Sequence, residues 1–206
     1  MLRYSARRGR EGRLMDDTGV STIDLAPLLK GAPSDRQAVA REIDSACTEV
    51  GFFAISGHGF SEDKVSELRA AAVEFFALPD SEKALVERPP ERISRGWNGM
   101  GDRSLAYSLG EETPPDLQES FVAGPDDVPN EPYFTCDRAL PFFAPNLCPQ
   151  SQPALRAAMT GYFDAMGGLA QALMQAFALA LDLPVGFFDD KIDRHASTLR
   201  LIRYFG

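Results

Sequence analysis

The sequence predicts an α+β fold in which helices pack on an incomplete β-sheet. Three features of the 206 residues lead to this prediction. Apolar residues recur at steps of three and four along three segments, which is typical of amphipathic helices. Short segments that alternate polar and apolar residues, or are bounded by glycines, predict strands. The last of these strands is expected to run almost to the final residue, so that one edge and one apolar face of the sheet would lack partners within this sequence.

The first predicted strand covers residues 20–25, and a helix is expected to begin at Ser34. Ser34 and Gln37 have the spacing of a capping box, in which each side chain satisfies a free backbone donor. Gly51 is expected to end this helix, because glycine accepts the left-handed conformation at that position. The helix should bury one apolar face, on which the cysteine would be a small core residue: Val39, Ile43, Cys47 and Val50.

A second strand and helix follow at once. Residues 52–55 form a short apolar run that predicts a buried strand, and residues 57–59 predict a turn. Ser61 is expected to cap the next helix, and residues 79–86 to add a helical turn or two. The inner face of this helix is predicted to contain Val65, Leu68, Ala72, Phe75 and Phe76.

Prolines and glycines are frequent in residues 89–149, where only 104–109 and 119–123 suggest strands. A long helix is then predicted over residues 151–183, with Ser151 as its cap and Pro153 in its first turn. Residues 185–188 predict one more turn, and residues 197–204 alternate like a strand. The long helix should bury the face that contains Leu155, Met159, Tyr162, Met166, Leu169, Leu173, Phe177 and Leu181.

Charge and hydropathy exclude two classes of partner. The net charge is −9, and without the first fourteen residues it falls to −13, which disfavours binding to a phosphate backbone. No uncharged apolar run reaches the length that a membrane-spanning helix needs. The first fourteen residues are basic, which fits either a transit peptide or a disordered tail ahead of a true start at Met15; their arginines are Arg3, Arg7, Arg8, Arg10 and Arg13.

The three cysteines, Cys47, Cys136 and Cys148, do not predict a disulfide framework. Their number is odd and no C-x-x-C pair occurs, so a zinc site is not indicated either. This usage fits a reducing compartment, and we expect a cytoplasmic protein.

The two histidines limit the metal sites that the chain can form. A 2-His-1-carboxylate iron site needs two histidines and an acid on one face of the metal. Its usual H-x-D form is absent, because neither His58 nor His195 has an acid two residues later. Asp193 and His195 could form a reversed version with distant His58. The alternatives are that His58 bonds nearby backbone in a turn and that His195 lies in a surface loop.

Six segments of the chain resemble, in the same order, motifs of one family. They are STIDLAPL at 21–28, AC with VGFFAISGHG at 46–59, FFALP with a following lysine at 75–83, RGW at 95–97, QESF at 118–121 and LRLIRY at 199–204. The resemblance is to the isopenicillin N synthase-like oxygenases, which include the plant-type 2-oxoglutarate dioxygenases and bacterial relatives.

The resemblance implies a fold and a chemistry. Members have a double-stranded β-helix, or jelly roll, with N-terminal helices outside it, and they use Fe(II) and 2-oxoglutarate. Residues 34–50 and 61–77 would be two of those helices, and 151–183 the long helix that supports the sheet. The H-x-D…H iron motif and the R-x-S motif for 2-oxoglutarate come later in members. We therefore expect a jelly roll truncated before its metal-binding strands, with no catalytic or metal residues and no bound cofactor.

Three residues match positions with a role in ligand binding in relatives. Tyr204 matches a tyrosine that hydrogen-bonds a 2-oxoglutarate carboxylate in many members; the alternative is an aromatic that fills the barrel. Arg95 and Trp97 match a segment that lines the substrate mouth. Arg95 could bind a substrate carboxylate, or it could be a surface arginine. Phe205 stands where the family usually has proline.

Three segments are predicted. Composition indicates a basic, disordered tail at 1–19, and the resemblance implies a dioxygenase N-terminal region at 20–150 and the long helix with the start of the oxygenase domain at 151–206. One hypothesis is a small-molecule oxygenase that releases succinate and CO2. Another is a non-catalytic remnant that binds no iron and associates through its strand edge. A third is a helical ligand-binding domain unrelated to oxygenases.

Overall fold

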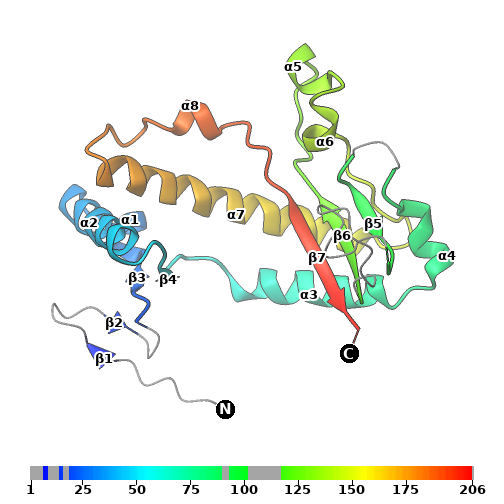
Figure 1. The fold of residues 1–206 in the computed structure, drawn as a ribbon, viewed down its shortest axis with the longest axis horizontal. Helices are drawn as coiled ribbons and strands as arrows, with labels where there is room; N and C mark the ends of the chain where they lie inside the picture. Colours follow the sequence, from blue (N-terminus) through cyan, green and yellow to red (C-terminus); the bar gives the residue numbers. More distant parts are fainter. Residues whose placement is uncertain (1–6, 9–13, 16–18, 90–92, 102–116, 206) are drawn as a thin grey trace, which may run out of the picture. The chain divides into compact units, whose positions relative to one another are not determined.

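The computed structural model describes residues 7–8, 14–15, 19–89, 93–101 and 117–205 (Figure 1). The chain divides into two compact units. The first comprises residues 1–60 and 165–193, and the second comprises 61–164 and 194–206. Both contain helices and strands, as the predicted α+β class requires. The three predicted segments are divisions of the sequence and stay predictions.

In the first unit, two helices pack on a parallel pair of strands. Strand β3 (Thr22–Asp24) pairs with β4 (Ala54–Ser56), and the helices are α1 (Ala26–Lys30) and α2 (Pro33–Glu49). Helix α7 (Pro153–Ala180) contributes its second half, and α8 (Asp189–Ile192) follows it. The core of this unit is apolar throughout, and its fully buried members are Ile23, Leu25, Ile43 and Ala176.

Helix α2 differs from its prediction at its start and on its faces. It begins at Pro33, and the Asp35 carboxylate accepts a hydrogen bond from the Ala32 N–H at 2.9 Å, so the predicted box of Ser34 and Gln37 is wrong. Cys47 is exposed rather than buried. The helix turns Val39, Ile43 and Ala46 inward, which rotates Cys47 toward solvent. Val50 follows the last residue of the helix and is 42% exposed.

A turn after β4 is fitted closely to the end of β3. The Asp24 carboxylate accepts a hydrogen bond from the Ala26 N–H at 2.9 Å and so satisfies a free donor of α1. Gly57 has φ +60°, and a Cβ atom there would collide with this carboxylate. His58 Nδ1 accepts from the Phe60 N–H at 3.1 Å. The prediction that His58 is a turn residue that bonds nearby backbone is therefore confirmed.

The predicted tail, residues 1–19, lies mostly outside the described residues. Within it, β1 (Arg7–Arg8) pairs antiparallel with β2 (Leu14–Met15). Disorder of the tail stays a prediction. In the described part of the chain, no helix is both long and apolar enough to cross a membrane.

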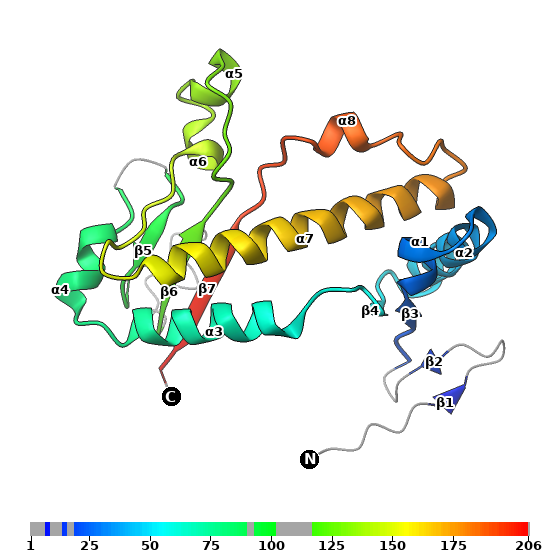
Figure 2. The same ribbon diagram turned by 180° about the vertical axis from the view of Figure 1, so that it is seen from behind.

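The second unit is built on an antiparallel sheet of order β5-β6-β7 (Figure 2). Helix α3 and the first half of α7 lie side by side in both views. The elements of this unit are α3 (Glu62–Phe76), α4 (Asp80–Lys83), η1 (Ala84–Val86), β5 (Gly96–Asn98), β6 (Gln118–Ala123), α5 (Pro132–Thr135), α6 (Leu140–Phe143) and β7 (Leu199–Tyr204).

Aromatic and aliphatic side chains join the sheet to the helices of this unit. Phe75 of α3 meets Phe121 of β6 edge to face, with 4.9 Å between ring centroids, and both are fully buried. Leu155 and Met159 of α7 belong to the same cluster. Burying one such side chain stabilises the fold by about 1.5–3 kcal/mol.

Several predictions for the second unit are confirmed. Ser61 caps α3, because its hydroxyl accepts from the Asp63 N–H at 3.2 Å. Strands β6 and β7 and the turns over residues 79–86 are present. Val65 is 45% exposed, however, so the inner face of α3 is narrower than predicted. The strand predicted at 104–109 lies outside the described residues.

The long helix ends earlier than predicted. Asp182 has φ +56°, and its N–H donates to the Leu179 carbonyl while the Leu183 N–H donates to the Ala178 carbonyl. This is the Schellman arrangement that terminates a helix. Leu181 therefore falls beyond α7 and is 60% exposed.

We predict that Gly57→Ala destabilises the chain more than Gly51→Ala does. Both glycines have positive φ, but a Cβ at Gly51 meets no atom within 4 Å, whereas at Gly57 it meets the Asp24 carboxylate. The control should cost about 1 kcal/mol from the left-handed backbone alone. Urea unfolding of both variants measures this, and equal losses would contradict the close fit of Gly57 to Asp24.

Candidate functional site

The two faces of the β5-β6-β7 sheet differ in chemistry. Directly opposed residues of neighbouring strands project to the same face. The register pairs Trp97 with Phe121 and Phe121 with Leu201, and these three face the helices of the second unit. Residues one position along each strand project to the opposite face. We call the face that contains Trp97, Phe121 and Leu201 the core face, and the opposite face of the sheet the open face.

On the core face, a buried carboxylate binds three donors. Glu119 is 2% exposed. Its Oε2 accepts from Lys83 Nζ at 2.8 Å and from Trp97 Nε1 at 2.8 Å, while Oε1 accepts from Arg203 Nη1 at 3.2 Å. We call Glu119, Lys83, Trp97 and Arg203 the Glu119 hub. It joins α4 to all three strands of the sheet.

The cations of the hub have further partners. Lys83 is 4% exposed, forms an ion pair with Asp80 at 3.0 Å and lies 5.1 Å from the centroid of the Trp97 ring. Arg203 also donates to the Phe76 carbonyl at the end of α3, at 2.6 Å. A buried ion pair is costly to desolvate and stable only when its hydrogen bonds are satisfied. Here both oxygens of Glu119 are satisfied.

Arg95 lies just before β5 and is fully buried. Its guanidinium donates to the carbonyls of Ser94, Phe142 and Ala144, and so satisfies the free carbonyls at the end of α6. Burial lowers the pKa of this guanidinium from its ordinary value. The alternative of a surface arginine is therefore wrong. In this chain Arg95 holds backbone together, and its contact with a substrate carboxylate stays a prediction.

The open face contains Tyr204 and an amide without partners. Tyr204 is opposite Gln118 in the register and is 72% exposed. One row along, Asn98, Ser120 and Ile202 are opposed across the three strands. Asn98 is 3% exposed, and neither its Nδ2 nor its Oδ1 has a hydrogen-bond partner among the described residues. Leaving a buried polar group unpaired costs about 1–3 kcal/mol.

The structure does not bring the three predicted site residues together. Trp97 faces the core and Tyr204 the open face, while Arg95 precedes the sheet. The ligand roles of all three stay predictions. Sequence reasoning missed Glu119 and Asn98. Glu119 belongs to the QESF segment that carries the resemblance, but its hydrogen bonds were not predicted, and nothing in the sequence marks Asn98.

The described residues do not fit an iron ion. They include no group of three or more His, Cys, Asp or Glu side chains that could hold a metal. His195 is half-buried and stacks on Phe163 with 5.6 Å between ring centroids, so its predicted place in a loop holds but its predicted surface exposure does not. That this chain binds no iron stays a prediction.

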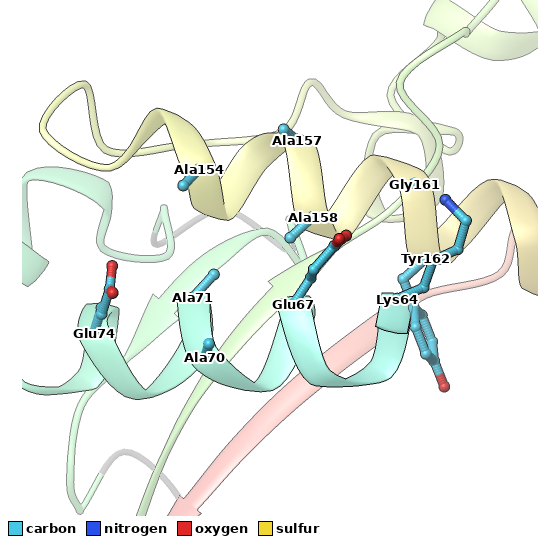
Figure 3. Close-up of a pocket in the computed structure, with 10 residues that line it drawn as sticks. All are labelled: Lys64, Glu67, Ala70, Ala71, Glu74, Ala154, Ala157, Ala158, Gly161 and Tyr162. Carbon is cyan, nitrogen blue, oxygen red and sulfur yellow. The ribbon is translucent and has the colours of Figure 1, made fainter. Parts of the chain in front are cut away.

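Two depressions in the second unit are lined by apolar and charged side chains. The one in Figure 3, of about 420 Å³, lies between α3 and α7 and is floored by small residues such as Ala71, Ala158 and Gly161, with Glu67 and Lys64 beside them. The other, of about 600 Å³, follows β7 and has a largely apolar lining, with side chains such as Val73 and Ile202, beside Arg69, Arg200 and Arg203.

We predict that Glu119→Gln lowers the free energy of unfolding by about 3–5 kcal/mol, because it leaves Lys83 buried without its carboxylate. Trp97 is the only tryptophan of the chain, so its emission reports unfolding in urea.

The matched control for this prediction is Asp80→Asn. Asp80 binds the same ammonium group but its side chain is 85% exposed, so its loss should cost at most about 1 kcal/mol. A smaller loss for Glu119→Gln than for this control would contradict a stabilising hub.

Comparison with known proteins identifies the family. The model of the non-haem dioxygenase N-terminal region, described from morphine synthesis, matches residues 20–151. Homoarginine-6-hydroxylase from Glycine max is 30% identical over 199 residues, which cover 93% of this chain and 57% of that protein. The chain thus spans little more than half the length of this relative.

Solved structures agree on the fold. A full-length Neurospora crassa protein in complex with alpha-KG and thymine has a TM-score of 0.72 at 22% identity, over 97% of this chain and 58% of that chain. JOX2 in complex with 2OG, Fe and JA has a TM-score of 0.60 at 19% identity, over 90% and 48%. The third hypothesis, an unrelated helical domain, is therefore wrong. The chain belongs to the 2-oxoglutarate- and Fe(II)-dependent oxygenase family and corresponds to its N-terminal region.

Proposed function

We propose that this chain is the N-terminal part of an oxygenase that oxidises a small molecule with Fe(II) and 2-oxoglutarate and releases succinate and CO2. The observation that carries the proposal is the position of Tyr204. Its ring is exposed on the open face, away from the helical core, while the Glu119 hub fixes the neighbouring residue of the same strand. A tyrosine so held can donate its hydroxyl to a carboxylate.

The proposed reaction depends on iron and 2-oxoglutarate, for which the residues described here would supply only part of the binding site. Bound iron in such enzymes activates O2 with 2-oxoglutarate as the co-substrate. Tyr204 would hold one carboxylate of 2-oxoglutarate, and Arg95 and Trp97 would act on the substrate through the backbone of β5 that they hold in place. The double-stranded β-helix is part of this proposal, with β7 as its first strand and the iron ligands on strands beyond residue 206.

For the substrate, we propose a small polar molecule of the kind that relatives name. Homoarginine appears in the name of one relative and thymine in one solved complex. The free thiols of all three cysteines fit the proposed cytoplasmic location.

A non-catalytic remnant is the second candidate. The depression along β7 favours it, because this edge strand and the exposed Val73 and Ile202 offer a surface for self-association. Loss of the metal-binding strands would leave these residues without their usual neighbours.

We predict that the purified 206-residue chain forms no succinate from 2-oxoglutarate with Fe(II) and O2, because its described residues include no iron-binding cluster. A longer product of the same gene, carrying an H-x-D…H motif and an R-x-S motif, should form succinate. Stoichiometric succinate from the short chain would contradict the truncation. Absence of these motifs in every reading frame beyond residue 206 would favour the remnant.

A further inference from the structure

The groove along β7 combines an apolar lining with positive charge. Its volume of about 600 Å³ is within the range of small-molecule sites, and its walls come mainly from α3 and β7 of the second unit. Three of its apolar side chains are exposed, Val73 at 64%, Val65 at 45% and Ile202 at 37%. Covering such side chains with an apolar ligand is favourable, because it removes them from water. Further apolar residues of the lining are Leu68, Ala72, Phe76, Leu199 and Leu201.

The charge of this groove is all of one sign. Arg69, Arg200 and Arg203 line it, and no acidic side chain does so among the described residues, although the net charge of the chain is −9. Arg203 is already engaged, because it donates to Glu119 and to the Phe76 carbonyl. Arg69 and Arg200 are exposed, and neither guanidinium forms an ion pair with a described acid. Two cations are thus left for a ligand to neutralise.

Arg69 and Arg200 lie in the same half of the groove. Helix α3 and strand β7 run toward the same end of the second unit (Figures 1 and 2), where Arg203 donates to the Phe76 carbonyl at 2.6 Å. Arg69 comes seven residues before Phe76 on the helix, and Arg200 comes three residues before Arg203 on the strand. Each is therefore about 10 Å from that contact along its own element. Guanidiniums from both walls can thus approach one group of a ligand.

This lining favours a small anion with an apolar body. A guanidinium donates paired hydrogen bonds to a carboxylate, and these bonds are stronger than those between neutral groups. A hydrocarbon chain attached to the carboxylate would cover the exposed valines and isoleucine of the groove. A polyanion would be repelled by the acidic chain. A second copy bound through the same groove would place its own arginines against these, because a two-fold interface brings the same surface together from both copies.

We propose that the groove along β7 is a binding site for a monocarboxylate with an unbranched hydrocarbon chain, as in a medium-chain fatty acid. Arg69 and Arg200 hold the carboxylate, and the apolar side chains of α3 and β7 cover the hydrocarbon. Tyr204 does not line the groove, so this site is separate from the one proposed for 2-oxoglutarate. The inference therefore goes beyond the oxygenase function.

Calorimetric titration of the 206-residue chain with decanoate, decanol and acetate tests both parts of the ligand. We expect saturable binding of decanoate at one site, at least about tenfold weaker binding of decanol, and no binding of acetate. Arg69→Gln and Arg200→Gln should each weaken decanoate binding about tenfold, because each removes a charge-assisted bond. Arg41→Gln, at an exposed arginine of α2, should leave it unchanged. No saturable binding, equal affinity for decanol, or undiminished affinity in both groove variants would overturn the proposal.

Val73→Asp tests where the hydrocarbon lies. Val73 is 64% exposed, so the variant should keep its melting temperature, but it places an acid in the groove and should weaken decanoate binding more than tenfold. The matched variant Val185→Asp changes an exposed valine of the first unit and should bind decanoate normally. Equal affinities in the two variants would overturn the proposal. A dimer that Val73→Asp disrupts and that excludes decanoate would assign the groove to a second copy and overturn it too. Neither titration depends on iron or turnover, so failure here is distinguishable from failure to find succinate formation by the longer gene product.

Discussion

The hydrogen bonds of one buried carboxylate hold the second unit together. Glu119 binds Lys83 from α4, Trp97 from β5 and Arg203 from β7, and Arg203 continues to the end of α3. Because ions are costly to bury, such a cluster is stable only when every partner is present. The segments that supply these partners lie up to 120 residues apart in the sequence. The hub therefore selects one arrangement of strands and helices among those that would bury similar apolar surface.

The β6–β7 register is set jointly by the apolar residues of β7 and by the Glu119 hub, and each excludes a different shift. Leu199 and Leu201 pack on the core, so a shift by one residue would expose them and is excluded by the hydrophobic effect. A shift by two residues keeps the same side chains on the core face. It would, however, place Glu119 opposite Leu201 or Phe205 instead of Arg203. The ion pair thus discriminates between registers that apolar packing alone accepts, and it places Tyr204 and Asn98 in neighbouring rows of the open face.

Local patterns in the sequence were enough to predict most elements, and the six ordered segments that resemble family motifs predicted the family. The Ser61 cap, the strands at 118–123 and 199–204, and the inward Leu155 and Met159 follow from local patterns. The exposure of Cys47 and the burial of Arg95 were missed because they depend on packing between distant segments. The state of Asn98 could not be predicted for the same reason, because its side-chain amide is buried and has no hydrogen-bond partner among the described residues.

The register of β6 and β7 is the most direct test of the role of Glu119. Cross-strand nuclear Overhauser effects in the native chain should connect Ser120 with Ile202 and no other row. In Glu119→Leu, the hub is lost while the apolar faces remain. We expect a second set of contacts displaced by two residues, with Ser120 opposite Arg200 or Tyr204, and weaker amide protection along β7. A single native register with native protection in that variant would contradict the claim that the buried carboxylate sets the sheet.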